Sequence, residues 1–489
     1  MANVTLKGQA HSSAYRTILR ATAIVGGASA INILIGLARN KVAAILLGPA
    51  GIGTIGLLLN LVTTVASLAG LGIAMSGVRA LASAADDDAR SHIRRVVGTL
   101  TLLLAAAGGI GIWLLREALA EYVLGNVDLA GQVGWLAPAV AFTIWSAMQI
   151  ALLNGLRKLR DLAQAQVGGS LLGTVLGIIA LFLWGQHGIT AYVIAAPLGM
   201  VIIGLIYTAR IPRRVKTMLT TGQTRREMHA LIQLGLPLML GGLAMPLGLL
   251  LIRTILGAQL GPAALGQFTA AWTLSATYVG FVLTAMGTDY FPRLSAAIYD
   301  HAVARKLVND QAEIALLLAL PVMLSMQTTA PWLIRMLYSD AFTPAVAILH
   351  WQIAGDVLKI ASWPLAFVVL AQGRGKLFWG IEVLFMSAMA GTVWLLVNWI
   401  GLVSAGVAYF IAYTIYWPTM LLVTKRIIGL DINLRVIAPA LFGLGAITLI
   451  GIMHGLTSSL ALIIGALLTL ASTTYSFLTI RKRFNTIRS

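Results

Sequence analysis

The sequence predicts an all-helical membrane protein that crosses the bilayer many times. Three observations lead to this fold class. First, 59% of the 489 residues are hydrophobic and only 10% are charged, whereas a soluble protein carries about 25% charged residues. Second, apolar stretches long enough to span a ~30 Å hydrocarbon core as helices recur along the whole chain. Third, the short segments between these stretches hold most of the lysines and arginines. A β-barrel would instead show alternating segments of about 10 residues.

The apolar stretches predict fourteen membrane-spanning helices, separated by short polar or Gly-containing segments. The shortest separations fall at 185–188 and at the turn from Asn398 to Gly401. The first eight helices are expected at 21–38, 51–76, 97–115, 133–153, 167–184, 188–209, 231–252 and 263–287. The other six are expected at 311–333, 344–371, 377–398, 401–424, 436–453 and 458–480.

The distribution of lysine and arginine predicts the orientation of these helices. With the N-terminus in the cytoplasm, 28 of the 34 lysines and arginines fall in the terminal segments and loops of the cytoplasmic side, as the positive-inside rule requires. Both termini are therefore expected in the cytoplasm. The net charge of +18 is explained by this topology, so no nucleic-acid partner is needed. The exceptions are Arg39, Lys41, Arg116, Arg253 and Arg335 on the outer side, and Lys359 within a span.

Two stretches share a pattern that indicates an internal repeat. "ARNKVAAILLGPAGIGTIGLLLNL" (38–61) and "IRTILGAQLGPAALGQFTAAWTL" (252–274) both contain a cation, a short apolar run and Leu-Gly-Pro-Ala. A second, shorter similarity relates "LLNGLRKL" (152–159) to "LAQGRGKL" (370–377). Parallel repeats build transporters with the substrate path between the lobes. We therefore expect two parallel six-helix lobes, 1–215 and 216–428, and a C-terminal segment, 429–489, with the last two helices. Chance similarity between Gly- and Pro-rich membrane segments is the alternative.

The Leu-Gly-Pro-Ala segments allow two interpretations. Pro49 and Pro262 fit the first position of a helix, where the missing N–H would have no partner, so they are expected to start the second and eighth helices. A helix N-terminus also attracts phosphate, and a cation precedes each segment. We favour the structural interpretation for the prolines and the functional one for the cations.

A polar stripe runs along the predicted helix 344–371. Gln352, Asp356, Lys359 and Trp363 lie on one face at helical spacing, and Asp356 and Lys359 are close enough in sequence to pair directly. A charge in the middle of a membrane helix costs about 2.5–3.5 kcal/mol on insertion scales and usually faces a cavity or a partner. The stripe is therefore expected to line a water-filled central cavity; a structural pair that locks this helix to a neighbour is the alternative.

Further polar residues suggest that this cavity is cationic. Asn32 and Arg39 share one face of the first helix, and Asn60 lies on a face of the second with several Ser and Thr hydroxyls. Arg253, at the end of the predicted helix 231–252, corresponds in the repeat to the pair of Arg39 and Lys41. Glu382, near the start of its helix, is either a titrating group or an interfacial charge whose side chain extends to the membrane surface.

Several activities are excluded or disfavoured. The chain has no cysteine, which removes disulfides and Cys-based metal sites. It has no P-loop, so ATP is not expected to drive it. No metal-ligand spacing occurs, and no loop is large enough for a catalytic domain. We expect a protein without a cofactor, and not an enzyme.

Three stretches of the sequence resemble a known family. "LLGPAGIG" with its preceding cation, "NGLRKLRD" and above all "WQIAGDVLK" are similar to Wzx-type flippases of the multidrug/oligosaccharidyl-lipid/polysaccharide (MOP) exporter superfamily. The resemblance covers about residues 15–425, because that pattern has twelve helices. "GLARNKVAAILLGPAG" also resembles lipid II flippases, where an arginine matching Arg39 lines the cavity.

The resemblance implies a function. It implies translocation of an undecaprenyl-pyrophosphate-linked oligosaccharide, an O-antigen or lipid III-like repeat unit, from the cytoplasmic to the periplasmic leaflet of a bacterial inner membrane. A polymerase and a chain-length regulator of the same pathway are possible partners. With no nucleotide site, we hypothesise coupling to an ion gradient, with Asp356 as the first titrating candidate. A drug/cation antiporter is an alternative, although cations outnumber acids here; an O-antigen polymerase or ligase would need a large periplasmic loop, and a scaffold would not need intramembrane charges.

Overall fold

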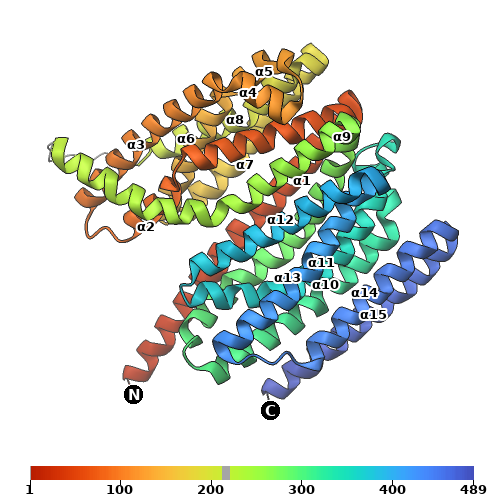
Figure 1. Ribbon diagram of the computed structural model, residues 1–489. Helices are drawn as coiled ribbons and strands as arrows, with labels where there is room; N and C mark the ends of the chain where they lie inside the picture. The colour runs from red at the N-terminus through yellow and green to blue at the C-terminus, as the bar shows by residue number, and fades with distance from the viewer. Residues whose placement is uncertain (1, 212–220, 489) are drawn as a thin grey trace. The chain divides into compact units, whose positions relative to one another are not determined.

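The computed structural model describes residues 2–211 and 221–488, and these residues are helical nearly throughout. Within these residues, ten stretches are long and apolar enough to cross a membrane. Four of the ten contain two predicted helices each, divided at Gly48, Gly185–Gly188, Gly261 and Gly401–Val403. The described residues therefore account for all fourteen predicted helices and confirm the all-α, polytopic fold class (Figure 1).

The helices have the following bounds. In the N-terminal half they are α1 (Ala2–Ala69), α2 (Ile73–Ala82), α3 (Asp87–Leu114), α4 (Arg116–Leu119), α5 (Ala130–Gly134), α6 (Ala137–Gly155), α7 (Leu159–Trp184) and α8 (Ile189–Ala209). They continue with α9 (Thr221–Ala297), α10 (His301–Leu337), α11 (Ala345–Ala371), α12 (Gly375–Ile400), α13 (Ser404–Ile428), α14 (Leu434–Leu456) and α15 (Ser458–Arg488). The short helical turns between them are η1 (Ala120–Leu124), η2 (Val127–Leu129), η3 (Gly185–Gly188), η4 (Asp340–Phe342) and η5 (Gly401–Val403).

The predicted ends of the helices 21–38 and 231–252 are wrong, because both helices continue further. Arg39 and Lys41 lie inside α1, and Arg253 lies inside α9. The segments after these cations are apolar and contain no proline, so the helix continues until the first strong breaker, Gly-Pro. Each basic residue therefore projects from a helix and not from a flexible connection.

The breaks in α1 and α9 have the same backbone conformation. Gly48 has φ 63° and ψ −168°, and Gly261 has φ 80° and ψ 176°. A side chain is strained at such positive φ values, which explains glycine at both positions. A proline follows each break and starts the next helical segment, as predicted for the second and eighth helices. The repeat seen in the sequence thus corresponds to a repeat of backbone geometry.

The two repeated segments also touch each other. A Cβ added to Gly53 would lie 2.2 Å from the carbonyl oxygen of Pro262, and one added to Gly266 would lie 1.8 Å from that of Pro49. Only glycine permits backbones to approach so closely. Each copy of the Gly-Pro segment therefore packs its glycine against the proline of the other copy.

The chain divides into two compact units. Unit 1 comprises 1–47 and 57–243, and unit 2 comprises 48–56 and 244–489. In unit 1, α7 packs along α8, and α6 packs on both α3 and α8. The lobe boundary predicted between residues 215 and 216 lies outside the described residues, and the division into 1–215, 216–428 and 429–489 stays a prediction.

In unit 2, α11 lies among other helices. It packs against α10, α12, α13 and α14, and most of its side chains are buried. Gly355 and Gly406 let α11 and α13 approach closely, because a Cβ at either position would collide with the other helix. The last two helices, α14 and α15, pack against α10 (Figure 1). The polar stripe of α11 is thus enclosed by the helices of its own unit.

Candidate functional site

Asp356 is the centre of a buried polar cluster in unit 2. Asp356 lies in α11 and is completely buried. One carboxylate oxygen accepts hydrogen bonds from the hydroxyl of Ser275, at 2.7 Å, and from that of Tyr278. The other oxygen accepts one from Tyr409, at 2.6 Å. The donors come from α9 and α13, so the carboxylate joins three helices through charge-assisted hydrogen bonds.

Lys359 takes part in this cluster through a tyrosine. In the described part of the chain, the direct ion pair that the spacing allowed is replaced by a bridge: Lys359 Nζ donates to the hydroxyl of Tyr409 at 3.3 Å, and Tyr409 donates to Asp356. The ammonium also lies 5.9 Å from the ring centroids of Tyr409 and Tyr413, within the range of a cation–π contact. The acid and the base are therefore coupled through α13.

Glu382 belongs to the same row of tyrosines. It lies half-buried in α12 and accepts a hydrogen bond from the Tyr416 hydroxyl at 2.9 Å. Tyr409, Tyr413 and Tyr416 stand on one face of α13, with ring centroids 4.9 Å and 5.7 Å apart along the row. The carboxylate is thus held by α13, and its side chain does not simply extend to the membrane surface.

The other two members of the stripe have different surroundings. Gln352 is completely buried, and neither end of its amide has a hydrogen-bond partner among the described residues. A buried amide without partners is costly, by about 1–3 kcal/mol, which makes it a candidate for contact with a ligand. Trp363 instead packs on the rings of Tyr290 and Phe367, with centroids 5.9 Å and 4.7 Å away.

In unit 1 the structure places the predicted residues on α1. Arg39 is half-buried, with its guanidinium carbon 5.7 Å from the ring centroid of Tyr192 in α8. Its Nε is buried and has no hydrogen-bond partner among the described residues. Lys41 and Asn32 lie half-buried on the same helix, and Asn32 Oδ1 is likewise without a donor in the described part of the chain.

The polar face predicted around Asn60 is largely satisfied within its own helix. Asn60 is buried and contacts Thr64 at 3.4 Å. Thr63, Thr64 and Ser67 donate their hydroxyls to backbone carbonyls three or four residues earlier. These hydroxyls therefore do not by themselves indicate a hydrated surface.

Arg253 differs from its counterparts in the first repeat. It is 7% exposed, and its guanidinium donates to the carbonyl oxygen of Gly56 within unit 2. Gly56 packs so tightly there that an added Cβ would lie 2.6 Å from the Thr269 hydroxyl. This arginine stabilises the contact between the two Gly-Pro segments, while its predicted role in binding substrate stays a prediction.

Sequence reasoning missed the tyrosine and serine donors of the cluster. They are Ser275, Tyr278, Tyr409, Tyr413 and Tyr416. The spacing of three tyrosines at i, i+4 and i+7 in the predicted helix 401–424 was the available signal. It shows that they share a face, but it does not show which helix that face contacts.

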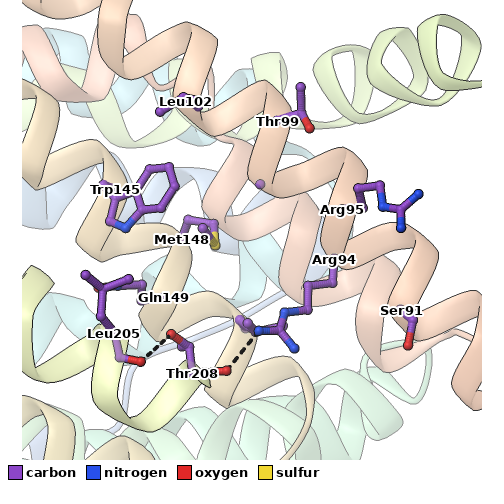
Figure 2. A pocket seen from close by; sticks show the side chains of 12 residues that line it. Ser91, Arg94, Arg95, Thr99, Leu102, Trp145, Met148, Gln149, Leu205 and Thr208 are labelled. Atoms are coloured by element: carbon purple, nitrogen blue, oxygen red, sulfur yellow. Dashed lines mark hydrogen bonds between the residues drawn. The ribbon is translucent and has the colours of Figure 1, made fainter. Parts of the chain in front are cut away.

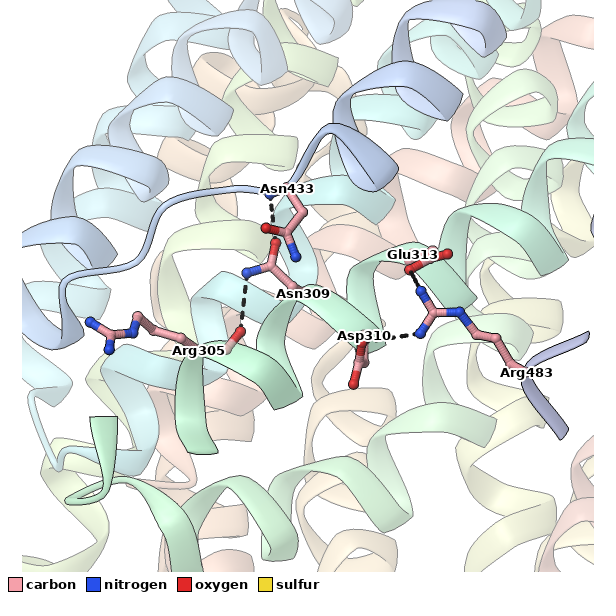
Figure 3. A network of polar contacts seen from close by, with 6 residues as sticks. All are labelled: Arg305, Asn309, Asp310, Glu313, Asn433 and Arg483. Atoms are coloured by element: carbon pink, nitrogen blue, oxygen red, sulfur yellow. Dashed lines mark hydrogen bonds and ion pairs between the residues drawn. The ribbon is translucent and has the colours of Figure 1, made fainter. Parts of the chain in front are cut away.

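Two further polar features lie outside this cluster. Unit 1 has a pocket of about 430 Å³ between α3, α6 and α8, with Arg94 and Arg95 at one end (Figure 2). In unit 2, α10 holds the C-terminal helices: Arg483 of α15 pairs with Asp310, at 3.2 Å, and with Glu313, while Asn309 contacts the segment before α14 (Figure 3). These contacts fix α14 and α15 to unit 2.

Comparison with known proteins assigns the chain to a family. The family model for polysaccharide biosynthesis proteins matches residues 42–347, which is more than half of the chain. The chain belongs to this family. Among curated proteins, the lipid III flippases of Escherichia coli (strain K12) and Shigella flexneri are each 26% identical over 413 residues, covering 82% of this chain and 96% of the relative.

Solved structures show which fold this member of the family has. The lipid II flippase MurJ in an inward closed conformation matches 93% of this chain and 98% of its own, with a TM-score of 0.71 and 15% identity. An inward-facing multidrug resistance MATE family transporter of the MOP superfamily covers 81% and 95%, with a TM-score of 0.67 and 18% identity. The predicted MOP-type fold is confirmed.

Proposed function

We propose that this protein translocates an undecaprenyl-pyrophosphate-linked oligosaccharide, an O-antigen or lipid III-like repeat unit, from the cytoplasmic to the periplasmic leaflet of a bacterial inner membrane by alternating access. Membership of a polysaccharide biosynthesis family and the flippase relatives support the substrate class. The MOP fold supports a transporter.

The observation that carries the mechanism is the carboxylate of Asp356, enclosed in a membrane span by three hydroxyl donors. An ionisable residue within a span is costly and marks an ion or substrate pathway. Binding of a proton or a cation to this carboxylate changes hydrogen bonds to α9 and α13 at once. We therefore assign ion coupling to Asp356, with Glu382 as a second carboxylate linked to it by the tyrosines of α13 and by Lys359.

Substrate contact is assigned to the cations and amides. Arg39 and Lys41 are the first candidates for the pyrophosphate, because guanidinium and ammonium groups pair with phosphate oxygens. The guanidinium of Arg39 rests on an aromatic ring and keeps a buried N–H without a partner among the described residues, so it has donor capacity for an anion. The other proposed contacts are Asn32, Asn60, Arg253, Gln352, Lys359 and Trp363.

The Lys/Arg asymmetry supports the orientation, with both termini in the cytoplasm. In this orientation the substrate is loaded from the cytoplasmic leaflet, where the lipid-linked unit is made. It is released into the periplasmic leaflet, where the unit is polymerised. A polymerase and a chain-length regulator acting on the same glycan are the proposed partners.

Reconstitution tests the function. The purified protein is placed in liposomes that contain a fluorescent undecaprenyl-pyrophosphate oligosaccharide, and a membrane-impermeant quencher reports the label that has reached the outer leaflet. We expect accelerated exchange of this lipid and none of a fluorescent phosphatidylcholine. A second assay measures ion-driven uptake of a cationic drug. Drug uptake without lipid exchange would contradict the flippase function and support a drug/cation antiporter.

A further inference from the structure

Unit 1 contains a pocket to which neither the family nor the proposed function assigns a role. It has a volume of about 430 Å³ and is enclosed by α3, α6 and α8. Figure 2 shows its two guanidinium groups towards one end and Trp145 and Leu205 towards the other. The pocket therefore has one basic end and one apolar end.

The basic end is built by α3. Arg94 donates to the carbonyl oxygens of Thr208, at 2.8 Å, and Ile211, at 3.1 Å, which hold its side chain in place. Arg95 is exposed, and no acidic side chain among the described residues pairs with it. Ser91 adds a hydroxyl on the same face. Two arginines and a hydroxyl form a donor set for a phosphate group.

Two acidic residues near this end of the pocket are already paired. Asp87 accepts from Arg90 at 3.0 Å, and Glu227 contacts His92 at 2.7 Å. The described residues that line the pocket include no Asp or Glu. The charged side chains that line the pocket among the described residues are thus all positive, which favours an anion.

The apolar end opens towards the part of the helices that faces lipid. Leu102 is 56% exposed and Leu205 is 47% exposed, and both belong to candidate membrane spans. Gly98 lies between Arg94 and Leu102 on α3, and a Cβ added there would meet nothing within 4 Å. A chain leaving the arginines can therefore run along α3 past Gly98 to the bilayer.

We propose that this pocket binds the phosphate headgroup of an anionic membrane phospholipid, with the start of its acyl chain along Gly98 and Leu102. The basic residues lie on the side of the membrane that the Lys/Arg bias assigns to the cytoplasm, where basic pockets between membrane helices bind such headgroups. A free phosphate would use the arginines but not the apolar end.

Native mass spectrometry and thermal unfolding of the detergent-purified protein test this. Dioleoyl phosphatidylglycerol is the probe, dioleoyl phosphatidylcholine is the zwitterionic control, and glycerol 3-phosphate represents the headgroup without chains. We expect phosphatidylglycerol to be retained and to raise the unfolding temperature, and the other two to have little effect. Arg95→Gln should bind phosphatidylglycerol about fivefold more weakly, the equivalent of ~1 kcal/mol per cation.

Two matched controls separate this pocket from general surface charge. Arg160→Gln removes an exposed arginine of the same unit, outside the pocket, and should bind like the wild type. Gly98→Phe fills the pocket and should lose the lipid, whereas Gly111→Phe, also on α3 with nothing within 4 Å, should keep it. Equal retention by Arg95→Gln and Arg160→Gln overturns the proposal, as does equal stabilisation by glycerol 3-phosphate. None of these readouts depends on translocation, so the result is independent of the proposed function.

Discussion

The cations of the first repeat and the charged cluster of unit 2 are held in different ways. Arg39 rests against the ring of Tyr192 and keeps an N–H without a partner among the described residues. Arg253, near the corresponding place in the second repeat, is buried and donates to a backbone carbonyl, while its Nε, like that of Arg39, has no partner among the described residues. Asp356 is enclosed by three hydroxyls. The two arginines thus differ in burial and in backbone contact, because Arg39 is half-buried whereas Arg253 is buried and donates to the Gly56 carbonyl oxygen. We therefore expect Arg39 to contribute more to ligand contact than to the fold, Arg253 to contribute more to the fold than to ligand contact, and Asp356 to serve internal coupling.

The largest effect on stability is expected from Asp356→Ala. It leaves the hydroxyls of Ser275, Tyr278 and Tyr409 buried without their acceptor, and each unsatisfied group costs ~1–3 kcal/mol. Thermal unfolding in detergent should show a large decrease. Asp340→Ala, which removes a carboxylate that is 89% exposed in the same unit, should change little. Similar unfolding temperatures for both variants would mean that the cluster does not stabilise unit 2.

Arg39→Gln should reduce translocation by about tenfold or more, because a hydrogen bond to a charged group contributes ~1.5–3 kcal/mol. The unfolding temperature should stay near that of the wild type, since this arginine supports little of the fold. Arg116→Gln is the matched control, because Arg116 also lies over an aromatic ring, 4.3 Å from the centroid of Trp113. Equal translocation by the two variants would remove Arg39 from the substrate site.

Arg253→Ala should lower stability by ~1.5–3 kcal/mol, the contribution of a hydrogen bond that involves a charged donor. Unfolding temperature is the readout, and Arg335→Ala, at an exposed position of the same unit, is the control. Translocation per folded molecule should fall less than in Arg39→Gln. A loss as large as that of Arg39→Gln, with unchanged stability, would show that the two repeats use their arginines alike.

The smallest effect is expected at the exposed turn before α14. The hydrogen bond from the Lys425 ammonium lowers the pKa of the Asp431 carboxyl from its usual value. A lowered pKa in the folded state contributes stability at neutral pH, and this contribution is lost as the pH falls through that lowered pKa. The small difference in unfolding temperature between the wild type and Asp431→Asn should therefore disappear in acid. A difference that grows in acid contradicts the assignment.

The sequence predicts the helices and the repeat better than the site. Apolar length and Gly-Pro breaks were sufficient to predict the fourteen spans, because only a continuous helix satisfies its backbone in lipid. The helices that carry Arg39 and Arg253 were predicted to end too early, because a cation in an apolar run does not end a helix. Helical spacing predicted that Asp356 and Lys359 share a face, but not that Tyr409 stands between them. Periodicity defines a face, whereas the partner of that face depends on how helices from distant parts of the chain pack.

Ion coupling through Asp356 is tested most directly by lipid exchange under an imposed ion gradient. Liposomes with the wild type or Asp356→Asn receive a proton or a sodium gradient, and exchange of the labelled lipid-linked oligosaccharide is recorded. Asn keeps the shape of the side chain and one acceptor oxygen, but not its charge. We predict that one of the gradients accelerates exchange by the wild type and that Asp356→Asn, folded to the same extent, does not respond. An unchanged gradient response in Asp356→Asn would contradict the assignment of coupling to this carboxylate.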